Sequence, residues 1–195
     1  TAVHANIDKI DAKDANVNIT VNDAAVANVS ADNVTAINAL QGATTGTVTA
    51  TIDGNGAELD GLTASGTTAT MALTITVDDT ATASAGAAIA DATSVANTGV
   101  NFALGITDSF AGVTNGTAVH ANMQAVDDKD PNVNITVNDA AVANVSEANV
   151  SAINALQAAT TGTVTATIDG NAAELANLTA SGADGKAAMA LTITV

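Results

Sequence analysis

The chain contains two copies of one sequence, and this internal repeat is the feature that most constrains its fold. Residues 1–66 recur closely as residues 117–182, an offset of 116 residues, and residues 17–30 return unchanged as residues 133–146. Chains built of copies usually form stacked arrays, which serve more often as scaffolds or binding surfaces than as enzymes. The repeat therefore predicts a stacked architecture for this chain.

A finer repeat lies within each copy, because a short alternating apolar run that ends in Asp recurs along the chain. The aspartates stand at positions 23, 53, 79, 108, 139 and 169, so one cycle covers about 29 residues. Each run alternates apolar and polar residues and is rich in β-branched side chains, which is typical of a strand. We expect strands over residues 18–23, 49–53, 74–79, 104–108, 134–139, 165–169 and 192–195.

Segments with helical spacing lie between the expected strands. The clearest covers residues 30–40, where Val34, Ile37 and Leu40 fall on one helical face and Ser30 is a suitable N-cap. Shorter helical patterns occur at residues 3–10, 56–65 and 87–95. The chain thus alternates strands with short helices.

This alternation predicts an α/β fold, because strands joined by same-sense crossovers pair in parallel. We expect a βα-solenoid of about 29-residue cycles with a parallel sheet. Residues 1–79 and 117–195 would be the two repeat copies, and residues 80–116 a connecting segment that forms a fourth cycle. The alternative is two compact repeat domains, mainly β with short helices, in which residues 80–116 act as a linker.

The amino-acid composition argues against some classes of binding partner. Twenty Asp and Glu residues against four Lys and Arg residues give a net charge of -16, which repels nucleic acid and anionic membrane surfaces. The chain has no Cys, which removes disulfides and thiolate metal sites, and it contains no apolar stretch long enough to insert in a membrane. We therefore expect neither nucleic acid nor a membrane as a partner.

The aspartates that end the runs form a column with two interpretations. Stacked layers would bring successive carboxylates close together, and Ca²⁺ prefers several oxygen ligands of this kind. Alternatively, each Asp ends a strand and caps the following turn or helix by accepting backbone N–H bonds. The candidate Ca²⁺ ligands are Asp23, Asp53, Asp79, Asp108, Asp139 and Asp169.

The other polar residues point to surfaces rather than to catalysis. Outward threonines such as Thr49, Thr51, Thr74 and Thr76 would form a flat face able to meet ice, carbohydrate or an identical sheet, although Thr is also common on any solvated strand. His4 and His120 occupy equivalent positions, each without a second His nearby. Because the usual acid–base and nucleophilic groups are scarce, we expect no enzymatic activity and no required cofactor.

Both ends of the chain resemble interior pieces of a stacked array, and neither carries an obvious polar cap. Stacked arrays expose apolar layers at uncapped ends. We therefore expect copies of this chain to be its partners, arranged as an end-to-end polymer or as tandem repeats. The residues expected to mediate self-association are Ile7, Ile10, Leu191, Ile193 and Val195.

Residues 18–25 and 36–51 resemble repeat regions of very large secreted and cell-surface proteins of cyanobacteria and marine bacteria. Those proteins are similarly acidic, free of Cys and poor in aromatic residues. Some are adhesins of the RTX type, whose Gly-Gly-x-Gly-x-Asp calcium repeat this chain lacks. The resemblance implies an extracellular structural protein or filament component, or alternatively an adhesin-type binding module that engages Ca²⁺ or carbohydrate.

Overall fold

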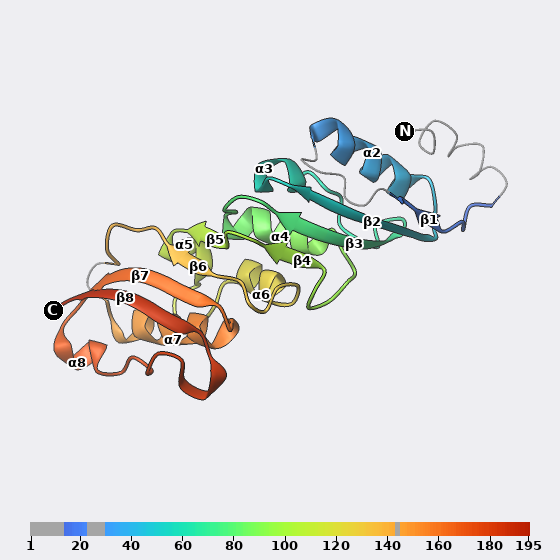
Figure 1. The fold of residues 1–195 in the computed structure, drawn as a ribbon. Coiled ribbons are helices and arrows are strands. Elements are labelled where there is room, and N and C mark those ends of the chain that lie inside the picture. Colours follow the sequence, from blue (N-terminus) through green and yellow to red (C-terminus); the bar gives the residue numbers. More distant parts are fainter. Residues whose placement is uncertain (1–13, 23–29, 143–144) are drawn as a thin grey trace.

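Parallel strands and short helices alternate along an elongated molecule, with the N-terminal and C-terminal parts at opposite ends (Figure 1). A computed structural model describes residues 14–22, 30–142 and 145–195. The described strands are β1 (Ile19–Thr20), β2 (Thr47–Gly54), β3 (Thr70–Val77), β4 (Val100–Phe102), β5 (Ile106–Asp108), β6 (Ile135–Val137), β7 (Thr163–Asp169) and β8 (Ala188–Thr194).

The helices are short and follow one another beside the strands. Several contact one another along the molecule, as α4 does with α3 and α6. The described helices are α2 (Ala31–Gly42), α3 (Gly56–Leu59), α4 (Ala83–Asp91), α5 (Phe110–Val113), α6 (Ala121–Asp127), α7 (Glu147–Ala159) and α8 (Ala172–Leu175), with a 3₁₀ turn, η2, at Ala183–Gly185.

The described strands form two four-stranded sheets, and within each sheet every strand pairs in parallel with the next one along the chain. The α/β class is therefore confirmed. In the first sheet Ile19 pairs with Val48, and Val48 in turn pairs with Met71. In the second sheet Ile135 pairs with Val164 and then Val164 with Met189. The sequence step between paired residues is longer for β1–β2, β5–β6 and β6–β7 than for β2–β3, β3–β4 and β7–β8, because the helices and loops between the strands differ in length.

The division into two sheets falls at the expected strand over residues 104–108, because β5 lies inside this range whereas β4 precedes it. β4 pairs with β3, and β5 pairs with β6, while residues 103–105 separate β4 from β5. Gly105 turns the chain here with a φ of 80°, a conformation that favours Gly. Ala81 still bridges Ile106 in parallel, with the same sequence step that joins Ile75 to Val100. The break therefore interrupts the pairing without changing its register.

The inward rows of the strands build the core. In β2 and β3 the alternate residues Val48, Ile52, Leu73 and Ile75 are at most 1% exposed, whereas the threonines between them face outward, as the period of two requires. Val34, Ile37 and Leu40 of α2 are buried as predicted. Among the described residues, one hydrophobic cluster extends from Ile19 to Ala187 and includes Ile89 of α4.

Buried polar side chains link each layer to the next. The Thr160 hydroxyl donates to the Val133 carbonyl oxygen at 2.7 Å and accepts from the Gly162 N–H. Thr44, at the same position of the first copy, makes the same bonds to Val17 and Gly46. Because a buried hydroxyl without partners is costly, these threonines satisfy their own polar groups and the neighbouring strand edge together.

Amide side chains repeat the same arrangement in both copies. The Asn18 side-chain oxygen accepts from Thr47 N–H at 2.8 Å, and Asn134 accepts from Thr163 N–H at the same distance. The nearly buried Gln41 donates to the Ala64 carbonyl oxygen in the next layer. Gln157 donates likewise to Ala180. Equivalent residues of the two sequence copies therefore make equivalent contacts between layers.

Candidate functional site

The most unusual surface of the described chain is the free edge of β8. This strand is the last of its sheet and pairs with β7. Its inward row is incompletely covered: Met189 and Leu191 are half-buried, whereas Ile193 is 48% exposed and Val195 is 81% exposed. Exposed apolar rows on an edge strand favour association, because the unpaired backbone and the side chains offer a surface for another strand.

The counterpart of this strand in the first copy is buried. Residues 71–77 and 189–195 have the same sequence, Met-Ala-Leu-Thr-Ile-Thr-Val. In β3, Met71 and Leu73 are 2% and 1% exposed, and Ile75 and Val77 are fully buried. The difference between the two strands therefore comes from their neighbours and not from their own residues.

The far edge of β3 is satisfied by the chain that follows it. Ile75 N–H donates to the Gly99 carbonyl oxygen at 2.9 Å, and Ser94 N–H donates to the Met71 carbonyl oxygen at 2.7 Å. The Thr93 hydroxyl donates to the Leu73 carbonyl oxygen at 2.7 Å. In the first copy, the chain that follows β3 therefore covers the edge of this heptapeptide through these hydrogen bonds.

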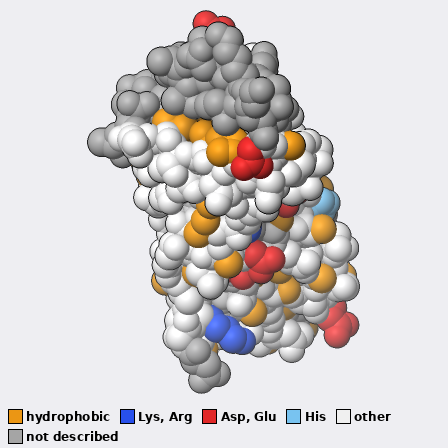
Figure 2. Space-filling view, turned by 90° about the vertical axis from the view of Figure 1, so that its right-hand side faces the viewer, with side chains coloured by type: hydrophobic (Ala, Val, Ile, Leu, Met, Phe, Trp, Pro, Cys, Tyr) orange, Lys and Arg blue, Asp and Glu red, His pale blue; other side chains and the backbone are white. Residues whose placement is uncertain are grey.

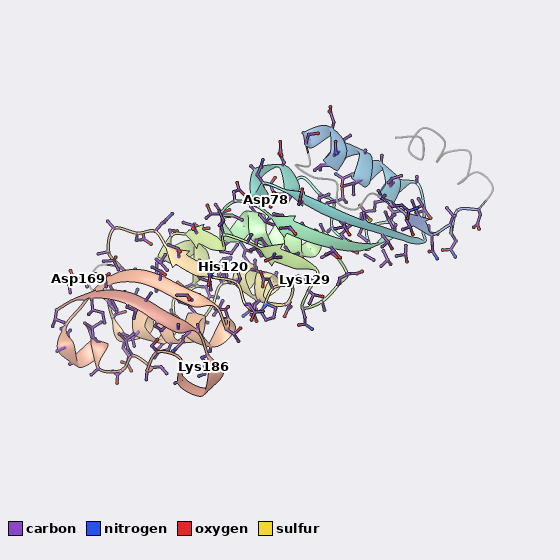
Figure 3. All side chains as sticks on the ribbon, viewed as in Figure 1. Asp78, His120, Lys129, Asp169 and Lys186 are labelled. Atoms are coloured by element: carbon purple, nitrogen blue, oxygen red, sulfur yellow. The ribbon has the colours of Figure 1, made fainter. Side chains whose placement is uncertain are left out.

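An open hollow lies at the same end of the molecule as β8. It is lined by Asp169, Gly170, Asn171, Glu174 and Val195. Figure 3 places Asp169 near the C-terminal end, well away from the labelled Asp78, His120 and Lys129. Asn171 is the N-cap of α8, and its side-chain oxygen accepts the N–H groups of Ala173 and Glu174. The hollow is therefore bordered by polar groups on one side and by Val195, which directly follows β8, on the other.

The aspartate column binds helix N-termini of the preceding layer. Asp79 Oδ1 accepts the Gly56 N–H at 2.7 Å, at the start of α3. Asp108 Oδ2 accepts the Ala83 N–H at 3.0 Å, at the start of α4, and its Oδ1 accepts the Ser109 N–H at 2.7 Å. Asp139 in turn accepts the Phe110 N–H at the start of α5. A carboxylate suits this position, because helix N-termini have unpaired N–H groups and positive potential.

The remaining candidate ligands lie apart from these caps. Asp53 is a half-buried residue of β2 that also has an interaction partner, and Asp169 is the exposed last residue of β7. Asp23 lies outside the described residues. In the part of the chain that the structure describes, no group of three or more His, Asp or Glu side chains is arranged to hold a metal ion. The Ca²⁺ site stays a prediction.

Of the residues expected to mediate self-association, Leu191 and Ile193 lie in β8, and Val195 directly follows this strand. Ile7 and Ile10 lie outside the described residues. Sequence reasoning missed Met189, which continues the same row. The sequence repeat could have identified Met189, because Met189 corresponds to the buried Met71.

The outward threonines form rows across the sheets. Thr51 pairs with Thr74, and Thr167 pairs with Thr192. Thr51, Thr74 and Thr192 are exposed. Ala72 and Ala190 interrupt the neighbouring rows, because they pair with Thr49 and Thr165.

Polar side chains elsewhere have structural contacts. His120 is the N-cap of α6, where its Nδ1 accepts the Asn122 N–H at 3.2 Å, and Lys129 Nζ donates to the Thr93 carbonyl oxygen at 2.8 Å. On the face turned to the viewer in Figure 2, apolar side chains are interspersed with polar surface and the acidic groups lie apart.

Comparison of the chain with protein families, with curated proteins and with solved structures finds no match. Among the described helices, none is both long enough and apolar enough to cross a membrane.

Proposed function

We propose that this chain is a structural repeat segment of an extracellular bacterial surface protein or filament, a βα-solenoid that associates end to end with copies of itself. The observation that carries the proposal is the contrast between two identical heptapeptides. In the first heptapeptide Met71, Leu73, Ile75 and Val77 are buried between layers, whereas Ile193 and Val195 of the second are 48% and 81% exposed. A surface of this kind is complete only when another layer covers it.

Such association would be favoured by the burial of exposed apolar side chains. Fully burying a Val or Ile side chain contributes about 1.5–3 kcal/mol relative to leaving it in water. Docking would bury the remaining exposed parts of Ile193 and Val195 and would also satisfy the free strand edge. The net charge of -16 opposes the approach of two copies, so association is expected to strengthen as salt screens that repulsion.

The polar contacts also support a structural role. Asp79, Asp108 and Asp139 hold adjacent layers together by accepting backbone N–H groups. Buried Thr and Gln side chains do the same at the helix ends. The acidic composition and the resemblance to secreted repeat proteins support an extracellular or cell-surface location.

The test is the oligomeric state of the full chain, measured by light scattering over a concentration series and by electron microscopy, with and without a chelator. We expect larger assemblies at high concentration and high salt that persist in chelator. Ile193→Asp should abolish them, because it puts a charge on the exposed apolar row. Thr192→Asp is the matched control, because Thr192 is exposed on the opposite face of the same strand. A chain that stays monomeric under all these conditions would contradict self-association.

The alternative is an adhesin-type binding module that engages Ca²⁺ or carbohydrate. The paired, exposed Thr51 and Thr74 favour it, because hydroxyl and methyl groups in register form a regular polar face. Calorimetric titration with Ca²⁺ and binding to immobilised glycans test it. Saturable binding that Thr51→Val and Thr74→Val remove would favour this function over the structural one.

A further inference from the structure

We infer that Asn115 is a site of spontaneous chemical modification, at which water replaces the side-chain amide in the folded protein. The chain contains two Asn-Gly pairs, Asn55-Gly56 and Asn115-Gly116. Asparagine is among the thermolabile residues, and a following glycine has no Cβ to shield its backbone nitrogen from the asparagine side chain. The structure closes the first of these pairs and leaves the second open.

The open pair lies in a turn at the start of the second sequence copy. Thr114 pairs with Val119 in an antiparallel bridge at the base of this turn. The Asn115 N–H donates to the Ala118 carbonyl oxygen at 3.0 Å. Residues 115–118 are all exposed, so water reaches the whole of the turn.

Neither reacting group of the open pair is held in place. Among the described residues, the Asn115 side chain and the Gly116 N–H have no hydrogen-bond partner. A Cβ at Gly116 would meet nothing within 4 Å, so the space around this residue is also free. The Asn115 carboxamide can therefore turn towards the Gly116 nitrogen without losing a contact.

The closed pair has the opposite arrangement. Asn55 is the N-cap of α3, where its Oδ1 accepts the Glu58 N–H at 3.0 Å and its Nδ2 donates to Glu58 Oε2 at 2.9 Å. Gly56 is buried, and its N–H donates to Asp79 Oδ1 at 2.7 Å. All of these hydrogen bonds must break before the Gly56 nitrogen can reach the Asn55 carboxamide.

The reaction consumes water and releases ammonia. The Gly116 nitrogen loses its proton and forms a bond to Asn115 Cγ, while the Cγ–Nδ2 bond breaks and ammonia leaves. Water then opens the cyclic succinimide at one of its two carbonyl carbons. One opening gives aspartate, and the other gives isoaspartate, in which the main chain runs through Cγ. Because only Asn115, Gly116 and water take part, the reaction does not depend on self-association.

The products change the turn in two ways. Both add a negative charge at an exposed position of a chain whose net charge is already -16. Isoaspartate also lengthens the main chain between Thr114 and Gly116. Thr114 and Val119 are only 3% and 7% exposed, so their bridge must absorb the added length within the packed interior.

The experiment compares the two asparagines in the folded and the unfolded chain. The full chain is incubated at mildly alkaline pH, one sample in buffer and one in guanidinium chloride, until the unfolded sample has reacted at both positions. Peptide mapping by mass spectrometry measures the reaction, because an acid is heavier than its amide. In the folded chain we expect Asn115 to react roughly tenfold or more faster than Asn55, because Asn55 must first open locally. In guanidinium chloride the two rates should be similar.

Two variants serve as controls. Asn115→Gln should abolish the reaction at this position, because the longer side chain forms the ring much less readily. Asp79→Ala frees the Gly56 N–H, so it should speed the reaction of Asn55 and leave that of Asn115 unchanged. Equal rates at the two asparagines in the folded chain, or an Asn115 that reacts only in guanidinium chloride, would overturn the inference.

The effect on the turn has its own test. Ion exchange separates the aspartate and isoaspartate forms of the incubated chain, and Asn115→Asp supplies the added charge without the added main-chain length. We expect the isoaspartate form to have a lower Tm than Asn115→Asp, and the aspartate form to match this variant. Equal Tm values for all three would overturn the predicted strain at the Thr114 and Val119 bridge.

Discussion

Ile75 and Ile193 occupy the same position of the same heptapeptide, yet Ile75 is fully buried and Ile193 is 48% exposed. Ile75→Ala should lower the free energy of unfolding by about 2–5 kcal/mol, because it leaves a cavity in the core. Ile193→Ala should cost about 1 kcal/mol or less, because roughly half of that side chain is already in water. Urea denaturation of both variants measures the difference. Equal losses would mean that the two strands are equally covered in solution.

Asp108 provides a test of capping against metal binding. Its carboxylate accepts the N–H groups of Ala83 and Ser109, so Asp108→Ala should lower the free energy of unfolding by about 1–2 kcal/mol. Asp108→Asn keeps one acceptor oxygen and should lose less. The exposed Asp60 supplies the control variant, Asp60→Ala. Denaturation is measured with and without chelator, and a loss that disappears in chelator would identify Asp108 as a metal ligand.

The buried hydroxyl of Thr160 should contribute more to the free energy of unfolding than the packing of a group of its size would. Thr160→Val keeps the shape of the side chain but leaves the Val133 carbonyl and the Gly162 N–H without their partner. We expect a loss of about 1–3 kcal/mol, and a similar loss for Thr44→Val in the first copy. Thr165→Val, on the exposed face of β7, should change stability by about 0.5 kcal/mol or less. If all three variants unfold alike, these hydroxyl contacts do not link the layers.

Gly105 is required because its φ is positive and because its position leaves no room for a side chain. Gly116 shares only the positive φ, so the same substitution there separates the two effects. Both Gly105 and Gly116 have positive φ, 80° and 97°, but a Cβ at Gly105 would lie 2.4 Å from the Asn134 carbonyl oxygen, whereas nothing lies within 4 Å at Gly116. Gly116→Ala should cost about 1–2 kcal/mol of left-handed strain. Gly105→Ala should cost clearly more, because the clash adds to the strain. Thermal unfolding of the two variants measures the difference in stability. Equal Tm values for Gly105→Ala and Gly116→Ala would argue against close contact between β5 and the β6 layer.

Asp127 should make stability depend on pH. Burial raises the pKa of the Asp127 carboxyl, and the carboxylates of Asp128 and Asp130 raise this pKa further. A raised pKa means that the folded state holds the proton more tightly than the unfolded state. The contribution of this group is therefore most favourable in acid and is lost as the pH rises through the raised pKa.

Asp127→Asn removes this titration. It should flatten the fall in the free energy of unfolding on the alkaline side of the ordinary Asp pKa, and it should leave the protein at least as stable near neutral pH. Asp60→Asn, the same substitution at an exposed aspartate, is the control. Urea denaturation over a pH series gives the comparison, and an unchanged pH profile for Asp127→Asn would contradict the assignment.

Much of the secondary structure was predictable from local pattern. The alternating runs that end in Asp predict β2, β6 and β7 at nearly the observed positions, because β-branched residues of period two are a strong strand signal. The face of α2 formed by Val34, Ile37 and Leu40 was equally clear. α4 begins at Ala83, ahead of the expected segment at residues 87–95, because its Ala, Ser and Gly residues have little helical periodicity.

The direction of the aspartate caps was not predictable. Sequence reasoning expected each Asp to cap the turn or helix that follows it. Asp108 does accept the next N–H, but Asp79, Asp108 and Asp139 also bind helices that begin one layer earlier in the chain. Only the stacking of layers brings a strand end beside the preceding helix. The split of residues 100–108 into β4 and β5 likewise depends on the turn at Gly105.

The sequence by itself determined where strands and helices alternate and which side chains form the inward rows, because both follow from the local period of apolar residues. Only the tertiary structure decided that one Met-Ala-Leu-Thr-Ile-Thr-Val segment is core and the other is surface. Burial is a property of what lies against a strand. Two identical strands therefore differ once β4 covers one edge and the other edge stays open.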